Sequence, residues 1–287
     1  MTQVKSFHSD EPDETWIEIL NPDIKLGHVR HALIDFDGTI SVIRQGWEDV
    51  MIPLMIEEIC EGMPPKPDIV DEVRRYVDYS TGILTIEQMR WLEEAVRRYG
   101  ISKHPKTAFE YKRIYNERLL KKVEKRLEKL ENGELSPDSM MIAGSLGFLK
   151  GLYERGVIMY LVSGTDHEYV INEARDLRIA DFFRGGIYGA LDHTEANTKE
   201  RIIQRTLDGY NLKGNELLVV GDGPVEIRNA KARNATALGV ASDEVKREGL
   251  NPRKRRRLIN AGADFIIADF KEHNRLFHFL FDEKDYS

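Results

Sequence analysis

The sequence predicts an α/β protein, with a doubly wound, Rossmann-like parallel sheet as its core and an α-helical domain inserted after the first core strand. From residue 157 onward, short apolar runs alternate with helical stretches, which is the pattern of βαβ units. Between residues 44 and 135, apolar residues recur at helical spacing and no strand-like run appears. We therefore expect an α/β core in residues 1–43 and 136–287 and a helical domain in residues 44–135.

The first 27 residues are expected to form an N-terminal extension of the core. Met1–Glu14 is polar and acidic, unlike a secretory signal, and Trp16–Leu20 is typical of a short strand ahead of the turn residues Asn21–Asp23. That strand could pair with the core sheet or with a partner, and nothing local decides between the two. The apolar run His31–Asp35 then predicts a buried strand whose carboxyl end opens into a loop.

The inserted segment divides into helices at recognisable breaks. Apolar residues at helical spacing run through Met51–Ile59 and Leu119–Leu130. Breaks are expected at Gly62–Pro65, near Gly100 and at Glu131–Glu134. In the rest of the chain, strands are expected at 157–162, 217–220, 236–240 and 265–267, and helices at 169–177, 199–207 and 226–232.

The charge and cysteine content argue against several classes of protein. Lys and Arg total 42 while Asp and Glu total 49, so the net charge is −7, and binding to nucleic acid or to a membrane surface would need a basic excess instead. The single cysteine, Cys60, excludes an internal disulfide and a multi-cysteine metal site. The apolar runs are too short to span a bilayer. We expect a soluble cytoplasmic protein, and the sequence leaves its oligomeric state open.

Carboxylates, hydroxyls and a lysine follow several of the predicted strands. In chain order they are Asp35, Asp37 and Thr39 after the first, Ser163 and Gly164 after the second, Lys199 at a helix start, and Asp222 and Glu226 after a third strand. Because ligands of open α/β sheets bind beyond the carboxyl ends of the strands, we expect these side chains to converge. Crowded carboxylates repel one another unless a cation lies among them, and oxygen ligands with a substrate phosphate favour Mg²⁺.

These residues resemble the signature motifs of the haloacid dehalogenase-like superfamily, in particular its phosphoglycolate-phosphatase-like branch with a helical cap. The motifs are Asp35-Phe36-Asp37-Gly38-Thr39, Ser163, Lys199, and Gly221-Asp222 with Glu226, in the family's order. The resemblance covers residues 31–43 and 139–281, and the inserted segment 44–135 is similar to the mobile caps of that family. It implies that the cap closes over the site and selects the substrate.

The resemblance also implies a role for each motif residue. Asp35 would be the nucleophile that forms an aspartyl-phosphate, and Asp37 would protonate the leaving oxygen and then activate water. Mg²⁺ would be held by the Asp35 carboxylate, the Asp37 backbone carbonyl and Asp222. Glu226, where many members have Asp, would hold the water shell of the metal. The residues expected to bind phosphoryl oxygens are Thr39, Ser163, Gly164 and Lys199.

Asp37 favours phosphoryl transfer over dehalogenation, because an alkoxide needs a proton to leave and a halide does not. The sequence therefore predicts a Mg²⁺-dependent phosphomonoesterase acting on a small phosphorylated metabolite, with a sugar phosphate as the favoured class. A phosphomutase of the same superfamily is the alternative, because it uses the same first motif. A non-catalytic binding module is a third hypothesis, disfavoured by the complete set of acids, hydroxyl and lysine.

Three further segments carry alternatives that the sequence leaves open. Arg44 and Trp47 would lie where core meets cap, either gripping an anionic group of the substrate or packing in a hinge. Ser80–Gly82 interrupts the cap helices and is either a specificity loop or an ordinary connection. The basic run Arg253–Arg257 follows Asn251-Pro252, which predicts the exposed first turns of a helix; given the net charge of −7, we expect a solvated surface.

Overall fold

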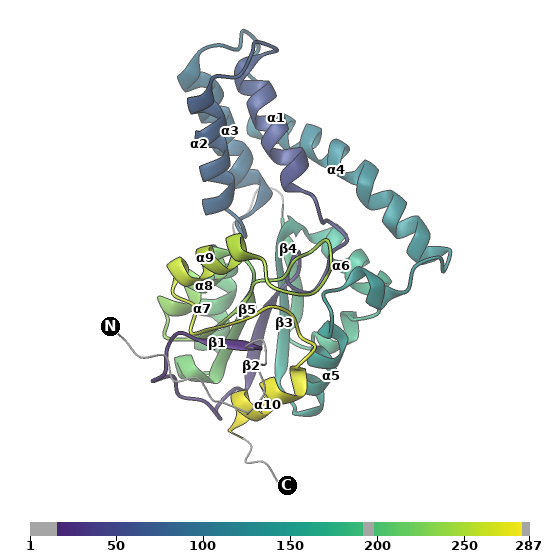
Figure 1. The fold of residues 1–287 in the computed structure, drawn as a ribbon, viewed down its shortest axis with the longest axis vertical. Coiled ribbons are helices and arrows are strands. Elements are labelled where there is room, and N and C mark those ends of the chain that lie inside the picture. The colour runs from purple at the N-terminus through teal and green to yellow at the C-terminus, as the bar shows by residue number, and fades with distance from the viewer. Residues whose placement is uncertain (1–15, 192–197, 283–287) are drawn as a thin grey trace.

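A seven-stranded sheet forms the centre of the computed structural model, which describes residues 16–191 and 198–282 (Figure 1). The expected polar segment Met1–Glu14 lies outside the described residues. The strands are β1 (Ile17–Ile19), β2 (His31–Asp35), β3 (Ile158–Asp166), β4 (Gly186–Ala190), β5 (Leu217–Gly221), β6 (Thr236–Val240) and β7 (Phe265–Ile267). Their order across the sheet is β1-β7-β6-β5-β2-β3-β4.

The order of the strands creates one topological switch point, at β2. From β2 the chain builds β3 and β4 on one side, and then returns to build β5, β6 and β7 on the other. All of these pairs are parallel, so the carboxyl ends of β2, β3 and β5 lie side by side. Ligands of doubly wound sheets bind at such a point.

Helices cover both faces of the sheet and confirm the doubly wound class. They are α5 (Ser145–Glu154), α6 (His167–Asp176), α7 (Lys199–Gly209), α8 (Pro224–Lys231), α9 (Pro252–Ala261) and α10 (His273–Phe281). Leu33 of β2 joins a buried apolar cluster with residues of α7, α8 and α9. Its neighbours Ala32 and Ile34 join a second cluster, with residues of α5, α6 and α10. Because successive side chains of β2 point to opposite faces of the sheet, each face of the sheet has its own apolar core.

The helices of the inserted segment stand over the carboxyl edge of the sheet (Figure 1). They are α1 (Glu48–Cys60), α2 (Pro67–Tyr79), α3 (Thr85–Tyr99) and α4 (Ala108–Glu131), and α1 packs against the other three. The breaks between them fall where glycine and proline predict. Helix α4 begins at a capping box, in which the Thr107 hydroxyl accepts from the Glu110 amide and Glu110 accepts from the Thr107 amide.

The N-terminal strand pairs with the core sheet, which settles the alternative that the sequence leaves open. β1 lies antiparallel to β7 at one edge, with Ile17 opposite Ile267. The opposite edge strand, β4, is missed by sequence reasoning because its segment Gly186–Ala190 contains two glycines and no apolar run. Among the described residues, no helix combines the length and apolarity needed to cross a membrane.

Candidate active site

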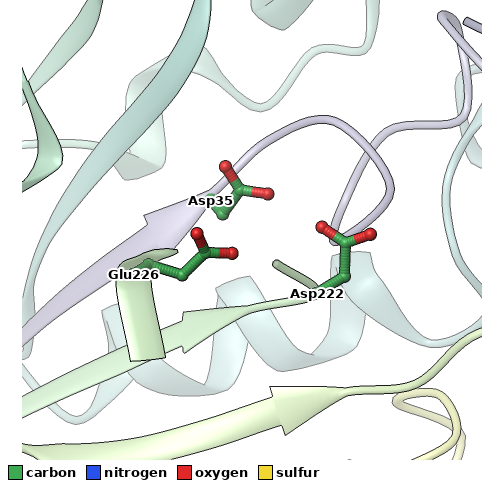
Figure 2. A group of neighbouring side chains, drawn as sticks. All are labelled: Asp35, Asp222 and Glu226. Atoms are coloured by element: carbon green, nitrogen blue, oxygen red, sulfur yellow. The ribbon is translucent and has the colours of Figure 1, made fainter. Parts of the chain in front are cut away.

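Three carboxylates from two strand ends and a helix meet at the switch point. Asp35 ends β2, Asp222 follows β5, and Glu226 lies in the first turn of α8 (Figure 2). All three are buried, and one oxygen of each lies within 4.8 Å of the others. The convergence expected from the sequence is therefore present, in a space from which water is largely excluded.

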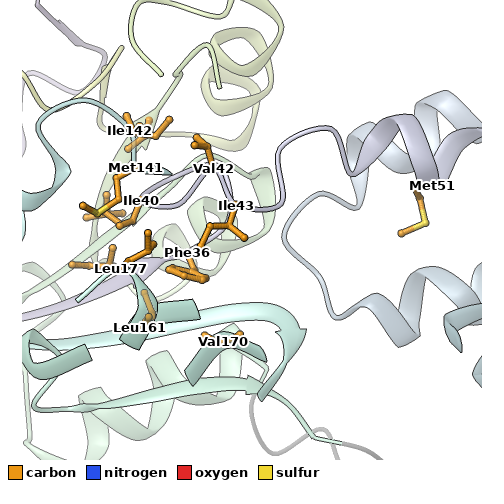
Figure 3. Close-up of a cluster of buried hydrophobic side chains, with 14 of the residues drawn as sticks. Phe36, Ile40, Val42, Ile43, Met51, Met141, Ile142, Leu161, Val170 and Leu177 are labelled. Carbon is orange, nitrogen blue, oxygen red and sulfur yellow. The ribbon is translucent and has the colours of Figure 1, made fainter. Parts of the chain in front are cut away.

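The loop after β2 holds its polar residues in place through apolar anchors. Phe36 and Ile40 are fully buried in the cluster beneath the loop, next to Leu161 of β3 (Figure 3). Gly38 adopts φ +76°, and a Cβ there would lie 2.6 Å from an Asp222 carboxylate oxygen. The turn therefore requires glycine, and it places the Asp35 and Thr39 side chains beside Asp222.

Lys199 lies between two of the carboxylates. Its ammonium is 2.6 Å from Asp35 Oδ1 and 2.9 Å from Glu226 Oε2, and the side chain is 4% exposed. Burial disfavours the ammonium, but Asp35 and Glu226 outweigh it and raise the pKa of Lys199. The other oxygen of Glu226 accepts from the Gly223 amide at 2.7 Å. Both oxygens of Glu226 are thus engaged in this arrangement, and their contacts hold Lys199 against Asp35.

Asp37 is held by the end of β3. The hydroxyls of Ser163 and Thr165 donate to Asp37 Oδ2, at 2.7 and 3.1 Å. The sequence motifs do not include Thr165, although its position two residues after Ser163 places it on the same side of the strand. The other oxygen of Asp37, Oδ1, is buried and has no hydrogen-bond partner among the described residues. Asp37 therefore keeps one oxygen for a further partner.

The carboxylate set fits a magnesium ion. Thr39 donates to Asp35 Oδ2 at 2.9 Å and lies 3.4 Å from Asp222 Oδ1, so it joins the two proposed ligands. Burial raises the pKa of Asp35 well above its usual value; Lys199 opposes that shift, while Glu226 and Asp222 add to it. A divalent cation among these oxygens would offset the repulsion and favour the ionised form of Asp35. The donor chemistry suits Mg²⁺, and Asp35 and Asp222 would be the side-chain ligands of such an ion.

The loop between α2 and α3 inserts into the site from the cap. A Cβ on Gly82 would lie 2.5 Å from Glu226 Oε2, and one on Gly164 would lie 2.2 Å from the Ile83 carbonyl oxygen. A Cβ on Gly223 would lie 2.8 Å from the Thr81 carbonyl oxygen. The glycines on both sides thus let the cap backbone approach the core backbone. The connection at Ser80–Gly82 therefore forms part of the site wall.

The loop closes a cavity of about 70 Å³ between core and cap. Asp35, Asp37 and Lys199 line its core side. The residues that line its cap side include Trp47, Thr81, Thr85, Gln88 and Tyr115. Hydroxyl, amide and aromatic groups of the cap therefore line the same cavity as Asp35 and Asp37.

Arg44 lines the cavity, but its guanidinium is already paired. It donates to Glu173 through Nε at 3.2 Å and Nη2 at 2.6 Å, and its Nε lies 3.9 Å from Asp37 Oδ1. Burial raises the pKa of Glu173 above its usual value, and the adjacent Arg44 guanidinium opposes the shift. The buried Arg44–Glu173 pair anchors the chain where the core passes into the cap, and Trp47 lines the same cavity as Arg44.

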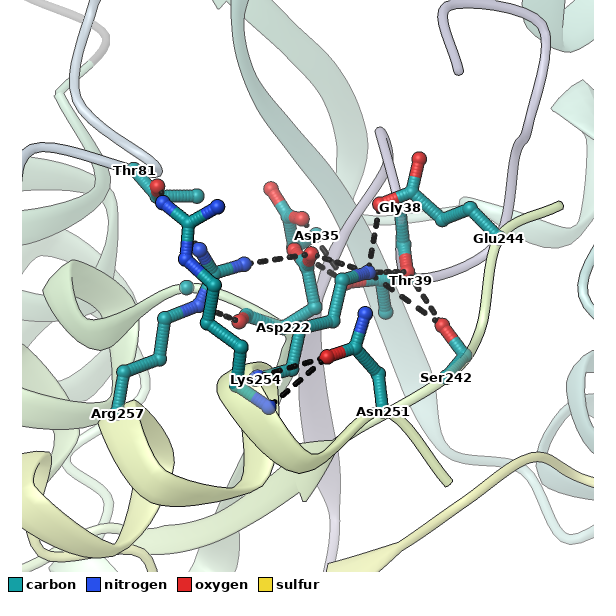
Figure 4. Close-up of polar contacts among 12 residues, drawn as sticks. Asp35, Gly38, Thr39, Thr81, Asp222, Ser242, Glu244, Asn251, Lys254 and Arg257 are labelled. Atoms are coloured by element: carbon teal, nitrogen blue, oxygen red, sulfur yellow. Dashed lines mark hydrogen bonds and ion pairs between the residues drawn. The ribbon is translucent and has the colours of Figure 1, made fainter. Parts of the chain in front are cut away.

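The basic run Arg253–Arg257 corrects the expectation of a fully solvated surface. It lies in α9 as predicted, but Lys254 and Arg257 are 5% and 8% exposed and point into the site (Figure 4). Lys254 Nζ is 2.7 Å from Asp222 Oδ2, and Arg257 Nη2 is 3.4 Å from the same oxygen. Burial opposes ionisation of Asp222, but these two cations outweigh it and lower the pKa of this carboxyl. One feature of the sequence is consistent with this shared contact: residues 254 and 257 are three apart and therefore lie on the same helix face.

Comparison with known proteins identifies the family. A model of the haloacid dehalogenase-like hydrolases matches residues 29–232, and the chain belongs to this family. The expected family is thus confirmed, and with it the class of hydrolase that the model describes. A search of curated proteins found no match.

Solved structures with the same fold include three with similar coverage. A predicted phosphatase from Clostridium acetobutylicum is 16% identical with a TM-score of 0.56, covering 87% of this chain and 99% of its own. A β-phosphoglucomutase from Clostridium difficile is 15% identical with a TM-score of 0.56, covering 89% and 98%. A predicted phosphoglycolate phosphatase from Haemophilus somnus is 14% identical with a TM-score of 0.55, covering 87% and 98%.

Proposed function

We propose that the protein is a Mg²⁺-dependent phosphomonoesterase that acts through an aspartyl-phosphate on Asp35. The observation that carries the proposal is the pairing of two aspartates with different surroundings. Asp35 lies against Lys199 and Thr39, groups suited to a phosphoryl centre. Asp37 is held through one oxygen by Ser163 and Thr165 and keeps the other for a proton.

The proposed reaction has two steps. In the first, an Asp35 oxygen forms a bond to phosphorus while the bond to the leaving oxygen breaks, and protonated Asp37 gives its proton to that oxygen. In the second, Asp37 accepts a proton from water as the water oxygen attacks phosphorus and releases Asp35. Lys199 stabilises charge on the phosphoryl oxygens. Mg²⁺, when bound by Asp35, the Asp37 carbonyl and Asp222, supplies further positive charge for the same purpose.

The lining of the cavity favours an uncharged, hydroxylated leaving group. Both cations that line it, Lys199 and Arg44, are paired with carboxylates in the described part of the chain. A carboxylate on the leaving group would therefore gain little attraction from Arg44, whose charge is already offset by Glu173. The negative charge of Glu173 would also repel it. Thr85 and Gln88 offer neutral hydrogen-bonding groups instead. These features support a sugar phosphate or polyol phosphate over a phosphorylated acid.

The test is phosphate release from a panel of phosphomonoesters, with and without Mg²⁺. We expect turnover of sugar or polyol phosphates that requires the metal. Asp35→Asn should reduce it by more than about a thousandfold, because the nucleophile is lost while the side-chain shape is kept. Asp181→Asn, a change of an exposed acid distant in sequence from every motif, is the matched control. Full turnover by Asp35→Asn would refute the proposal.

A phosphomutase would use the same two aspartates. Two of the neighbouring structures carry that description, a β-phosphoglucomutase from Clostridium difficile and a putative one from Bacteroides vulgatus. The same panel separates the two functions when products are analysed. Isomerised sugar phosphate without release of inorganic phosphate, dependent on a trace of bisphosphate, would favour the mutase.

A further inference from the structure

Helix α9 presents cations to the metal-binding site and to the cap at the same time. On its core side, Arg257 donates to the Asp222 carbonyl oxygen from Nε at 3.2 Å and lies 3.4 Å from Asp222 Oδ2. On its cap side, Nη1 of the same guanidinium donates to Thr81 Oγ1 at 3.2 Å. One buried side chain therefore contacts both the proposed metal ligand and the loop that closes the site (Figure 4).

The cap also supplies counter-charges to this guanidinium. Arg257 Nη1 lies 3.6 Å from Asp78 Oδ1 at the end of α2 and 3.7 Å from Glu48 Oε1 at the start of α1. The neighbouring Arg253 pairs with the same two acids, at 2.9 and 3.0 Å. Two cations of the core thus meet two acids of the cap, and these pairs exist only while the cap lies on the core.

The second cation at Asp222 does not depend on the cap. Lys254 Nζ is 2.7 Å from Asp222 Oδ2 and 2.7 Å from Glu244 Oε1, and it donates to the Gly38 carbonyl oxygen at 3.2 Å. These partners all belong to the core. Lys254 is thus neutralised whether the cap is closed or open, whereas Arg257 shares its charge with the cap.

A cation beside a metal ligand opposes metal binding, because the two positive charges repel across a short, poorly screened distance. With the cap closed, Glu48 and Asp78 offset the charge of Arg257. When the cap is open, Glu48 and Asp78 no longer lie near Arg257. The positive charge of Arg257 then acts on the Asp222 site without these two counter-charges. The affinity of the Asp222 site for a divalent cation should therefore be higher in the closed form.

From this arrangement we infer that Arg257 is a positioning residue that couples closure of the cap to Mg²⁺ binding at Asp222. The inference rests on the proposed function in one respect, the role of Asp222 as a metal ligand. Such coupling is reciprocal: if closure strengthens Mg²⁺ binding, bound Mg²⁺ favours closure by the same factor. The site would then assemble only when metal and cap are both in place.

The experiment is isothermal titration of the full chain with Mg²⁺ alone. Asp78→Asn removes a cap charge without touching Asp222, and we expect it to weaken Mg²⁺ binding about fivefold. Asp71→Asn is the matched control, because this exposed acid lies on the same helix and forms no ion pair with α9 within the described part of the chain. It should change the affinity less than about twofold.

Arg257→Gln closes the double-mutant cycle. In that background, Asp78→Asn should change the Mg²⁺ affinity less than about twofold, since the residue that carries the coupling is gone. Should Arg257→Gln fail to fold, Glu48→Gln provides a second cap-side variant with the same expected loss as Asp78→Asn.

The outcomes separate the two proposals. Equal Mg²⁺ affinities for Asp78→Asn, Asp71→Asn and the unchanged protein would overturn the coupling and leave the proposed function standing. An unchanged protein that binds no Mg²⁺ would overturn both. A loss of affinity in Asp78→Asn that persists in the Arg257→Gln background would show that the cap acts by another route, and would overturn the role of Arg257.

Discussion

Gly82 is the cap residue whose backbone comes against the Lys199–Glu226 pair. A Cβ at this position would lie 2.5 Å from Glu226 Oε2 and 3.1 Å from Lys199 Nζ, and the residue has φ +96°. The core cannot yield easily here, because Glu226 is fully buried and holds the Gly223 amide as well. A side chain at position 82 would therefore displace the cap rather than the core.

Replacing Gly82 with alanine should reduce kcat/KM at least tenfold, roughly the cost of about 1.4 kcal/mol in transition-state stabilisation. The reason is that the added methyl group keeps the loop from its closed position. Gly62→Ala is the matched control, since Gly62 also has a positive φ, +78°, in a cap loop, but a Cβ there would meet no described atom within 4 Å. Steady-state phosphate release measures both, and equal losses in the two variants would contradict the prediction.

Glu173 determines whether Arg44 can receive a second anion. The two side chains form a bidentate contact while both are buried, so the positive charge of Arg44 is matched inside the protein. The contact joins residues 129 positions apart in the chain. We therefore expect any effect on substrate specificity to depend on the pair and not on either residue alone.

Glu173→Gln should relax discrimination against acidic substrates. We expect the ratio of kcat/KM for glycerol 3-phosphate to that for 3-phosphoglycerate to fall about tenfold, because Arg44 gains a free charge for the carboxylate. The two compounds differ at the carbon that bears the carboxylate, so they serve as a matched pair. An unchanged ratio in a folded variant would show that Arg44 does not face the leaving group.

At the scale of elements, α9 illustrates how one helix serves several neighbours. Its face at residues 254 and 257 contacts Asp222, and Arg253 contacts the cap. Arg255 pairs with Glu18 of β1. A basic run on an acidic protein therefore serves intramolecular contacts here, with acidic partners drawn from the core, the cap and the edge strand.

Helix α4 (Ala108–Glu131) begins with a capping box, which satisfies backbone amides of its first turn. Thr107→Ala should lower the free energy of unfolding by about 1 kcal/mol, since the cap hydroxyl is lost. Urea denaturation measures the change, and Thr107→Ser should retain most of the stability. An equal loss in both variants would mean that the methyl group, and not the hydroxyl, supports the helix.

At the scale of the molecule, the sheet and the cap contribute different parts of the site. The sheet brings the ends of β2, β3 and β5 together, which assembles the carboxylates and the hydroxyls. The cap brings the loop at residues 81–83 and the polar lining opposite them. The core therefore supplies the carboxylates and hydroxyls of the candidate site, and the cap supplies the opposite wall of its cavity.

The sequence alone determined the fold class, the family and the residues that converge at the switch point. It could do so because buried parallel strands are short apolar runs, and because the first motif, Asp35–Thr39, lies within five consecutive residues. The sequence does not determine the pairing of β1 and does not indicate β4, since an edge strand needs little apolar sequence.

Only the tertiary structure decided what the charged side chains outside the motifs do. Arg253 and Asp78 are 175 residues apart, and Arg257 and Thr81 are 176 apart. Local sequence contains no information on such pairs, because a cation on a helix face is equally suited to water and to a distant carboxylate. In the folded protein, Lys254, Arg257 and Arg44 are buried away from water. Their charges are offset by acids from distant segments of the chain, which lie beside them only after folding.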